Sequence, residues 1–242
     1  MPISISQLLR LSIATIKRDP IILAPYLFFF VVTQLVMPFF DLPTSFEFQK
    51  WTTSMTLVFL SQWIFELFFK LGTISLAKAT FLSPTHRISL KQALKSVLIH
   101  YIPTLIWSAL LLSPLVLAFI FGTPFLGQYG ISPQIFWFFL GVLLLPVGLC
   151  VEFLPTVLIC GVGSWRSAAW TSLQFIKRNL RAVLIFMALS VTILMGSVLV
   201  ASVLALAPGS IGVLLSNLAQ GVGYGVIYTI NPILFLANLQ RD

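Results

Sequence analysis

Six apolar runs, each long enough to cross a lipid bilayer as a helix, occupy most of this chain. They lie at about residues 20–40, 52–81, 102–121, 133–160, 182–207 and 211–236. A helix rises about 1.5 Å per residue, so about 20 apolar residues cross a hydrocarbon core about 30 Å thick. Because backbone polar groups in the bilayer must bond within their own segment, runs of this length favour helices. The sequence therefore predicts an all-α, polytopic membrane protein with six transmembrane helices.

Charged residues are scarce, and most of them stand beside the apolar runs. Hydrophobic residues make up 59% of the chain and charged residues 8%, with a mean hydropathy of +1.05, which is far from the composition of soluble domains. With six acidic residues in 242, we expect no soluble domain and treat residues 1–242 as a single integral membrane domain. The net charge of +8 forms no solvated basic patch, so we expect no nucleic acid partner.

Lysine and arginine are distributed unequally between the two sides that six spans would create. Twelve lie in the N-terminal segment, in the segments after the second and fourth runs, and in the C-terminal tail, whereas Lys50 alone lies on the opposite side. Cytoplasmic loops are enriched in Lys and Arg. This asymmetry predicts that both termini face the cytoplasm.

Residues 164–181, SWRSAAWTSLQFIKRNLR, combine an apolar stripe with a basic face at helical spacing. The apolar positions that recur along the helix are Trp165, Ala169, Leu173, Ile176 and Leu180. The polar and basic positions that fall mostly elsewhere on the helix are Arg166, Gln174, Lys177, Arg178 and Arg181. The pattern predicts an amphipathic helix that lies along the membrane surface.

Two further segments resemble this one. Stretches that start at Ser6, Ser89 and Ser167 each carry a Lys, His or Arg eleven residues later and begin an apolar run fourteen residues later. The chain therefore resembles three tandem units, at about 1–83, 84–163 and 164–242, each with an amphipathic helix and two spans. The alternative is that any multi-span protein places cations ahead of its spans.

All three amphipathic helices are expected on the cytoplasmic face of the membrane. Their apolar side chains would lie at the headgroup boundary, and their cations would face water and anionic lipid. The candidate lipid-surface residues are Arg10, Lys17, Arg18, Lys91, Lys95, Trp165, Arg166, Lys177, Arg178 and Arg181. The expected partners are membrane lipids, a membrane protein or a second copy of the chain.

A few polar residues interrupt the apolar runs and form a candidate intramembrane site. Gln62, Glu66 and Lys70 are spaced by four residues and so lie on one helix face. Ionisable groups at this depth are costly unless they are paired or turned towards protein or water. Glu66 and Lys70 are in the favourable order for an intrahelical ion pair, and a substrate or ion pathway is the alternative. Glu152 has the same two interpretations, structural and functional.

The sequence contains no motif that indicates catalysis, a cofactor or a metal site. His86, His100, Cys150 and Cys160 have no partners at ligand spacing. The string GVGYG at 221–225 resembles a potassium-channel filter, but a filter needs a pore helix before it and a full span after it. We therefore interpret these glycines as helix-packing residues. A stripe of small residues formed by Gly212, Ser216, Ala219 and Gly223 predicts a close helix contact.

The segments WRSAAWTSLQFIKRNLRAVLIF, PTVLICGVG and QLLRLSIATIKRDPIIL resemble those of bacterial six-span inner-membrane proteins of the YciC type. They are also similar to the membrane region attached to some glycerophosphodiester phosphodiesterases. The resemblance covers nearly the whole chain. It implies a multi-pass protein of the bacterial inner membrane with no assigned chemistry, and the catalytic domain of the phosphodiesterases has no counterpart here.

Three classes of function remain open at this point. The favoured hypothesis is a non-enzymatic membrane module, of a membrane-organising or accessory kind, that acts on lipid or on a partner protein. The second is a transporter or transporter subunit that uses Glu66, Lys70 and Glu152 as a midplane polar site. The third is an enzyme, which the absence of catalytic motifs disfavours.

Overall fold

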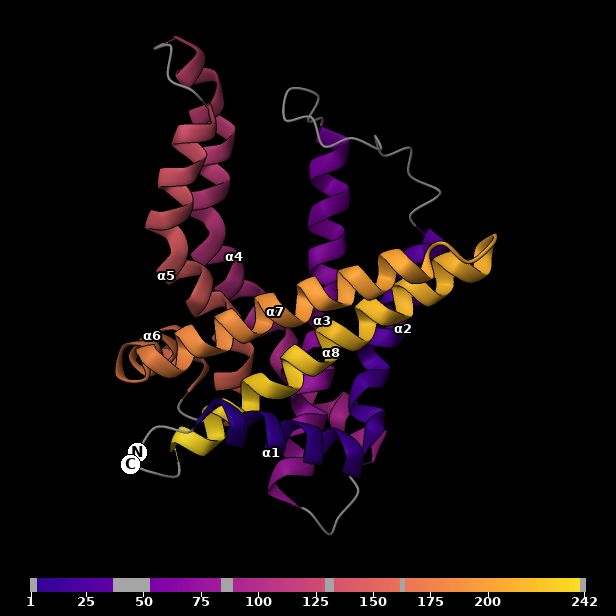
Figure 1. The fold of residues 1–242 in the computed structure, drawn as a ribbon. Coiled ribbons are helices and arrows are strands. Elements are labelled where there is room, and N and C mark those ends of the chain that lie inside the picture. Colours follow the sequence, from indigo (N-terminus) through magenta and orange to yellow (C-terminus); the bar gives the residue numbers. More distant parts are fainter. Residues whose placement is uncertain (1–3, 37–52, 84–88, 129–132, 162–163, 240–242) are drawn as a thin grey trace.

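The computed structural model describes residues 4–36, 53–83, 89–128, 133–161 and 164–239, and these ranges are helical apart from short turns. Figure 1 shows the α-helices in chain order. Their bounds are α1 (Ile5–Arg18), α2 (Ala24–Val36), α3 (Thr53–Leu82), α4 (Leu90–Gln128), α5 (Pro133–Cys160), α6 (Ala168–Arg178), α7 (Leu180–Leu204) and α8 (Ser210–Leu239). Short 3-10 turns, η1 (Pro20–Leu23) and η4 (Trp165–Ser167), precede α2 and α6. The predicted all-α fold class is confirmed.

Among the described residues, three segments are long and apolar enough to cross a membrane: Leu90–Pro114, Leu180–Leu204 and Ser210–Leu239. Shorter apolar helices cover Pro20–Leu35 and Leu145–Cys160. These segments fit a membrane protein. Residues 37–52, with the expected polar loop and Lys50, lie outside the described residues, as do Arg87 and Arg241.

The last helix, α8, is the centre of the fold. It contacts α1, α2, α3, α5 and α7, and its C-terminal half from Gly221 to Asn238 is largely buried. The neighbouring α7 forms an antiparallel hairpin with α8 and leaves most of its aliphatic surface exposed. The sequence explains this difference, because α8 carries Gly, Tyr, Thr and Asn that need protein neighbours, whereas aliphatic α7 can face lipid.

Three glycines of α8 lie where it meets its neighbours most closely. A Cβ atom on Gly221 would lie 3.2 Å from the Leu27 Cα of α2, and one on Gly223 would lie 2.6 Å from the Ser197 Oγ of α7. A Cβ atom on Gly225 would lie similarly close to η1. The interpretation of the GVGYG string as helix-packing glycines is therefore confirmed. Of the predicted small-residue stripe, Gly223 makes the close contact between α7 and α8.

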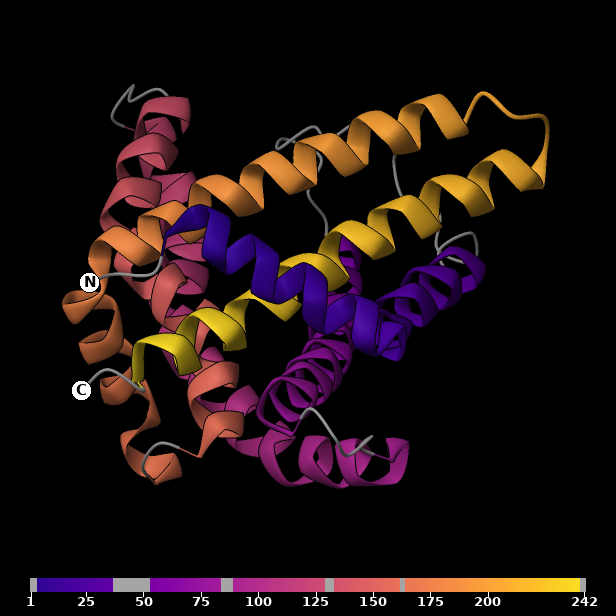
Figure 2. The same cartoon turned by 60° about the horizontal axis from the view of Figure 1, so that its bottom comes forward.

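The first and third amphipathic segments form separate helices, α1 and α6. Each ends after the tripeptide Ile-Lys-Arg, and the residues that cap them are Asp19 and Asn179. The Asn179 side chain donates to the Phe175 carbonyl, and the Asp19 carboxylate accepts from the Ile21 amide of the next turn. Figure 2 shows α1 crossing α8.

The second amphipathic segment is not a separate helix, which corrects the prediction. Residues 90–128 form one continuous helix, α4. The stretch that corresponds to the caps of α1 and α6 reads His-Tyr-Ile at 100–102, and it offers no Asp or Asn to end a helix. Instead, the Thr104 hydroxyl donates to the His100 carbonyl within the continuing helix.

Candidate functional site

Side chains from α2, α3, α5 and α8 form a buried polar cluster at the centre of the molecule. Lys70 Nζ on α3 lies 2.6 Å from Glu152 Oε2 on α5, which makes an ion pair across 82 positions of sequence. The same ammonium lies 4.5 Å from the centre of the Tyr228 ring on α8. The predicted intrahelical pair of Glu66 with Lys70 is therefore wrong, because α5 presents a carboxylate closer to the amine.

Glu66 takes part in the cluster through a different contact. The Tyr26 hydroxyl on α2 donates to Glu66 Oε1 at 3.3 Å. Tyr26 is fully buried, and the close approach of α2 to α8 at Gly221 brings it there. Three of the predicted intramembrane residues therefore meet at one place, namely Glu66, Lys70 and Glu152. The fourth, Gln62, lies one turn before Glu66 and does not line the cavities described below.

Tyrosine rings form one wall of the cluster. Tyr26 stacks on Tyr228 with ring centres 4.9 Å apart and on Tyr224 at 5.7 Å. Tyr224 and Tyr228 are four residues apart on α8, so they share a face. Sequence reasoning missed these rings, although two tyrosines at this spacing inside a glycine-rich apolar helix are a signal that could have indicated them.

Two further polar residues hold Glu152 in place and were also missed. The Asn231 amide Nδ2 lies 3.4 Å from both the backbone oxygen and Oε1 of Glu152. The Thr156 hydroxyl donates to Asn231 Oδ1 at 2.9 Å, and both residues are fully buried. The large majority of buried polar groups in proteins are hydrogen-bonded, and Thr156 and Asn231 follow this rule. The polar residues Thr229 and Asn231, close together in a predicted transmembrane run, were the available signal.

Two cavities lie on either side of Glu152. The first, of about 210 Å³, is lined by Trp63, Glu66, Leu67, Lys70, Ser108, Gly148, Val151, Glu152 and Tyr228. The second, of about 370 Å³, is mostly apolar and lies between α5, α7 and α8, with Glu152, Ser190, Tyr224 and Tyr228 as its polar lining. Gly148, Glu152 and Tyr228 border both cavities.

Each cavity contains a buried hydroxyl without a protein partner. Ser108 Oγ lines the first cavity and Ser190 Oγ lines the second, and neither forms a hydrogen bond in the structure. Leaving a buried hydroxyl unpaired costs about 1–3 kcal/mol. Both hydroxyls are therefore available to a ligand or to water.

The second candidate site is the exposed face of α6. Ala168, Ser172, Phe175 and Ile176 are buried, and the Ser172 hydroxyl donates to a backbone carbonyl of α5 at 3.0 Å. The predicted apolar stripe is therefore divided, since Ile176 packs inside the protein. Other large apolar residues of this segment remain exposed, namely Trp165 at 50%, Trp170 at 62% and Leu173 at 38%. The predicted cations Arg166, Lys177, Arg178 and Arg181 are also exposed.

The remaining candidate lipid-surface residues lie on α1 and on the first turns of α4. Arg10 and Lys17 are exposed on α1, as are Lys91 and Lys95 on α4. Arg18 is exposed as well, and its guanidinium also donates to the Thr80 carbonyl of α3 at 3.3 Å. This contact ties the end of α1 to the end of α3.

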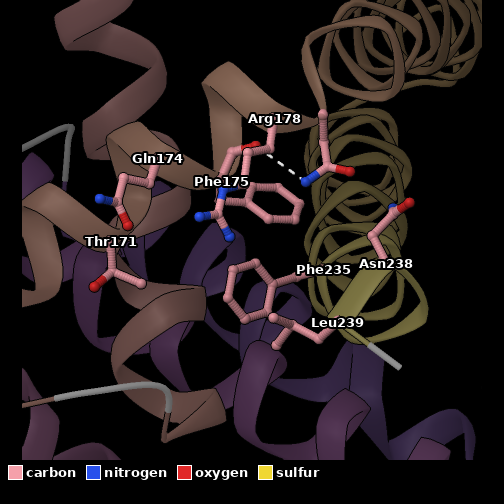
Figure 3. Close-up of a pocket in the computed structure, with 8 residues that line it drawn as sticks. Thr171, Gln174, Phe175, Arg178, Phe235, Asn238 and Leu239 are labelled. Atoms are coloured by element: carbon pink, nitrogen blue, oxygen red, sulfur yellow. Dashed lines mark hydrogen bonds between the residues drawn. The ribbon is translucent and has the colours of Figure 1, made fainter. Parts of the chain in front are cut away.

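A small cavity of about 160 Å³ lies between α6 and α8 (Figure 3). Its lining consists of Thr171, Gln174, Phe175, Arg178, Asn179, Phe235, Asn238 and Leu239. The Phe175 and Phe235 rings pack with centres 4.6 Å apart. Arg178 lies near the C-terminal ends of both helices, where the backbone carbonyls carry partial negative charge. Its guanidinium therefore complements the helix ends, which disfavours an anion inside this cavity.

Comparison with known proteins found no matching family model, no matching curated protein and no matching solved structure.

Proposed function

We propose that this chain is a non-enzymatic, six-span membrane module that acts on anionic lipid through its amphipathic helices. The observation that carries the proposal is the outer face of α6. Trp170 and Leu173 are exposed there beside four exposed cations. Aromatic and aliphatic side chains next to Lys and Arg are typical of helices that lie in the membrane interface.

The packing of α6 leaves this face available. Small and apolar residues such as Ala168 and Ser172 anchor the helix to the protein, so lipid contact does not require α6 to move. Each Lys or Arg near an anionic surface contributes about 1 kcal/mol of attraction. The four cations lie on α6 and beside its two ends, with Arg166 in η4, Lys177 and Arg178 on α6, and Arg181 in the first turn of α7. Together they would hold anionic headgroups around this part of the protein.

Helices other than the three most apolar segments also support the proposal of six spans. η1 with α2 forms an apolar helix up to residue 35, and α5 is 28 residues long. α3 is 30 residues long, and its charged residues Glu66 and Lys70 bond to neighbouring helices. An ionisable residue that faces the bundle interior is compatible with a transmembrane helix.

We propose that both termini and α6 face the cytoplasm, because Lys and Arg are concentrated in the segments that would lie on that side. The resemblance to YciC-type proteins supports a location in the bacterial inner membrane. In this orientation α1 and α6 would meet the cytoplasmic leaflet, whose anionic lipids attract basic segments.

The test uses the full-length protein in nanodiscs with zwitterionic lipid alone or with added phosphatidylglycerol. Cys150 and Cys160 are replaced by Ala, and a polarity-sensitive fluorophore is attached to Leu173→Cys. We expect a more apolar emission in anionic nanodiscs, which is reversed by salt. The triple variant K177Q/R178Q/R181Q should lose this response, and the control variant Lys50→Gln should keep it. The same emission in both lipids would show that protein packing alone positions α6.

The second candidate function, a transporter or transporter subunit, is favoured by a different observation. Glu152, which pairs with Lys70, borders both cavities, and buried ionisable groups beside cavities are typical of substrate or ion pathways. Binding of a solute in the first cavity would be its minimal requirement.

A further inference from the structure

The polar cluster contains one carboxylate more than it contains ammonium groups. Among the described residues that line the first cavity, the ionisable acids are Glu66 and Glu152, and the base is Lys70. Lys70 is already bound to Glu152 at 2.6 Å. Glu66 hydrogen-bonds a neutral partner, the Tyr26 hydroxyl, on one of its oxygens, and it shares the charge of Lys70, one turn further along α3, with Glu152. An ionised carboxylate in a low-dielectric interior requires a positive partner.

A second, independent feature points into the same cavity. Ser108 is 0% exposed and lines the cavity, and its Oγ has no hydrogen-bond partner in the structure. It is supplied by α4, whereas Glu66 comes from α3. An acceptor oxygen of Glu66 and the Ser108 hydroxyl are therefore both available to one donor group.

The walls and the volume of the cavity indicate the size of the missing partner. Trp63, one turn from Glu66, supplies an aromatic side chain to the cavity lining, and aromatic faces attract organic cations. The Tyr228 ring is already in contact with Lys70 and Tyr26. The cavity has a volume of about 210 Å³, whereas a single water molecule needs about 10–15 Å³ of cavity volume. The space exceeds what a bare alkali ion requires and fits an ammonium group with a short carbon skeleton.

Lys70 shows how this site holds such a group. Its ammonium is bound by one carboxylate and lies over one tyrosine ring, at 2.6 Å from Glu152 and 4.5 Å from the Tyr228 centre. We propose that the cavity bordered by Trp63, Glu66 and Ser108 binds a small organic ammonium ion. Glu66 neutralises its charge, Ser108 accepts a hydrogen bond from it, and Trp63 contacts its carbon atoms. This site is independent of the lipid-surface role of α6.

Binding is measured on the full-length protein in nanodiscs with propylammonium chloride as the probe, against sodium and potassium chloride at equal ionic strength. The readouts are the thermal midpoint of unfolding and tryptophan fluorescence. We expect propylammonium to raise the midpoint in a saturable way and to change the fluorescence. Trp63→Phe should remove most of the fluorescence change, since Trp63 is the tryptophan that lines the cavity.

Two variants test the assigned contacts. Glu66→Gln should weaken propylammonium binding by at least about 30-fold, because the buried positive charge loses its partner. Ser108→Ala removes a hydroxyl without breaking any protein hydrogen bond, so it should fold normally and weaken binding about two- to tenfold. Gln62→Leu, one turn away and outside the cavity lining, is the matched control and should bind as the parent does.

Three results would overturn the proposal. The first is an absence of any propylammonium response in the parent protein, which would mean that Glu66 is neutral and needs no cation. The second is an equal response in Glu66→Gln or Ser108→Ala, which would place the probe elsewhere. The third is a response to sodium or potassium in place of propylammonium, which would assign the site to an alkali ion. The K177Q/R178Q/R181Q variant should bind propylammonium normally, so failure of the lipid-surface proposal remains distinguishable.

Discussion

Lys70 on α3 and Glu152 on α5 form an ion pair of 2.6 Å between Nζ and Oε2. The pair joins two helices that are separated by α4 in the sequence, and Asn231 from α8 bonds to the same carboxylate. Glu152 thereby connects α3, α5 and α8. Because the side chains of this pair are 10% and 29% exposed, water can compensate only part of the charge if one partner is removed.

We expect Lys70→Met to destabilise the protein by about 3 kcal/mol, because it leaves Glu152 as an uncompensated buried charge. The double variant Lys70→Met/Glu152→Gln should recover much of this loss, since no charge then remains. The measurement is the free energy of unfolding in mixed micelles during an SDS titration. A double variant that is less stable than Lys70→Met would contradict this expectation, because Glu152 would then stabilise the fold through contacts other than Lys70.

Asn231→Ala should cost about 2 kcal/mol of stability, because it leaves Thr156 and Glu152 with unpaired buried groups. Asn217 provides a matched control on the same helix. Its amide donates to Gln34 at 2.9 Å in a less buried position, so Asn217→Ala should cost less than about 1 kcal/mol. The thermal midpoints of both variants in detergent give the comparison, and equal losses would contradict the role assigned to Asn231.

Gly223→Ala should destabilise the hairpin of α7 and α8, because the new Cβ would lie 2.6 Å from Ser197 Oγ. Ser197→Gly should relieve this clash in the double variant, at some cost in helix propensity. The control is Gly196→Ala, a position where a Cβ meets nothing within 4 Å. SDS resistance of the three variants measures the effect. A neutral Gly223→Ala would show that α7 can move away from α8 at little cost.

The proposed topology predicts the location of reporters fused to the chain. Fusions at Asp242 and within residues 84–95 should report the cytoplasm, whereas fusions near Thr44 or within residues 129–132 should report the opposite side. The physical basis is the concentration of Lys and Arg on the first side. The measurement uses two enzyme reporters, of which one is active only in the cytoplasm and the other only in the periplasm. Activity of the periplasmic reporter at Asp242 would exclude an even number of spans with a cytoplasmic N-terminus.

The apolar runs, together with the residues that begin and end helices, were sufficient to predict much of the fold. The predicted fourth run, 133–160, coincides with α5, and the short gap between the fifth and sixth runs falls at the turn between α7 and α8, where Gly209 has a φ of +67°. Both are local signals, because an apolar run and its flanking Pro, Gly or charge lie close together in the sequence. The prediction of a second, separate amphipathic helix was wrong. Such a helix needs a capping residue at its end, and residues 100–102 contain none.

The partners within the candidate site could not be predicted in the same way. Glu66, Lys70 and Glu152 were recognised because charge in an apolar run is conspicuous. Which of them pair depends on how helices pack, and 82 residues separate Lys70 from Glu152. Tyr26 and Asn231 were missed because a Tyr or Asn carries no charge signal, and their role follows only from the contact of α2 and α5 with α8.

The depth of the α6 surface in the membrane tests the central claim most directly. A spin label at Trp170→Cys, in a background without the native cysteines, is exposed in nanodiscs to membrane-soluble oxygen and to a water-soluble nickel complex. Labels at Leu199, an exposed position on α7, and at the C-terminal residue Asp242 serve as references for hydrocarbon and water. We predict that the label at 170 lies between these two references, at headgroup depth. A label at 170 as deep as the one at 199, or protected from both reagents, would contradict the placement of α6 at the lipid surface.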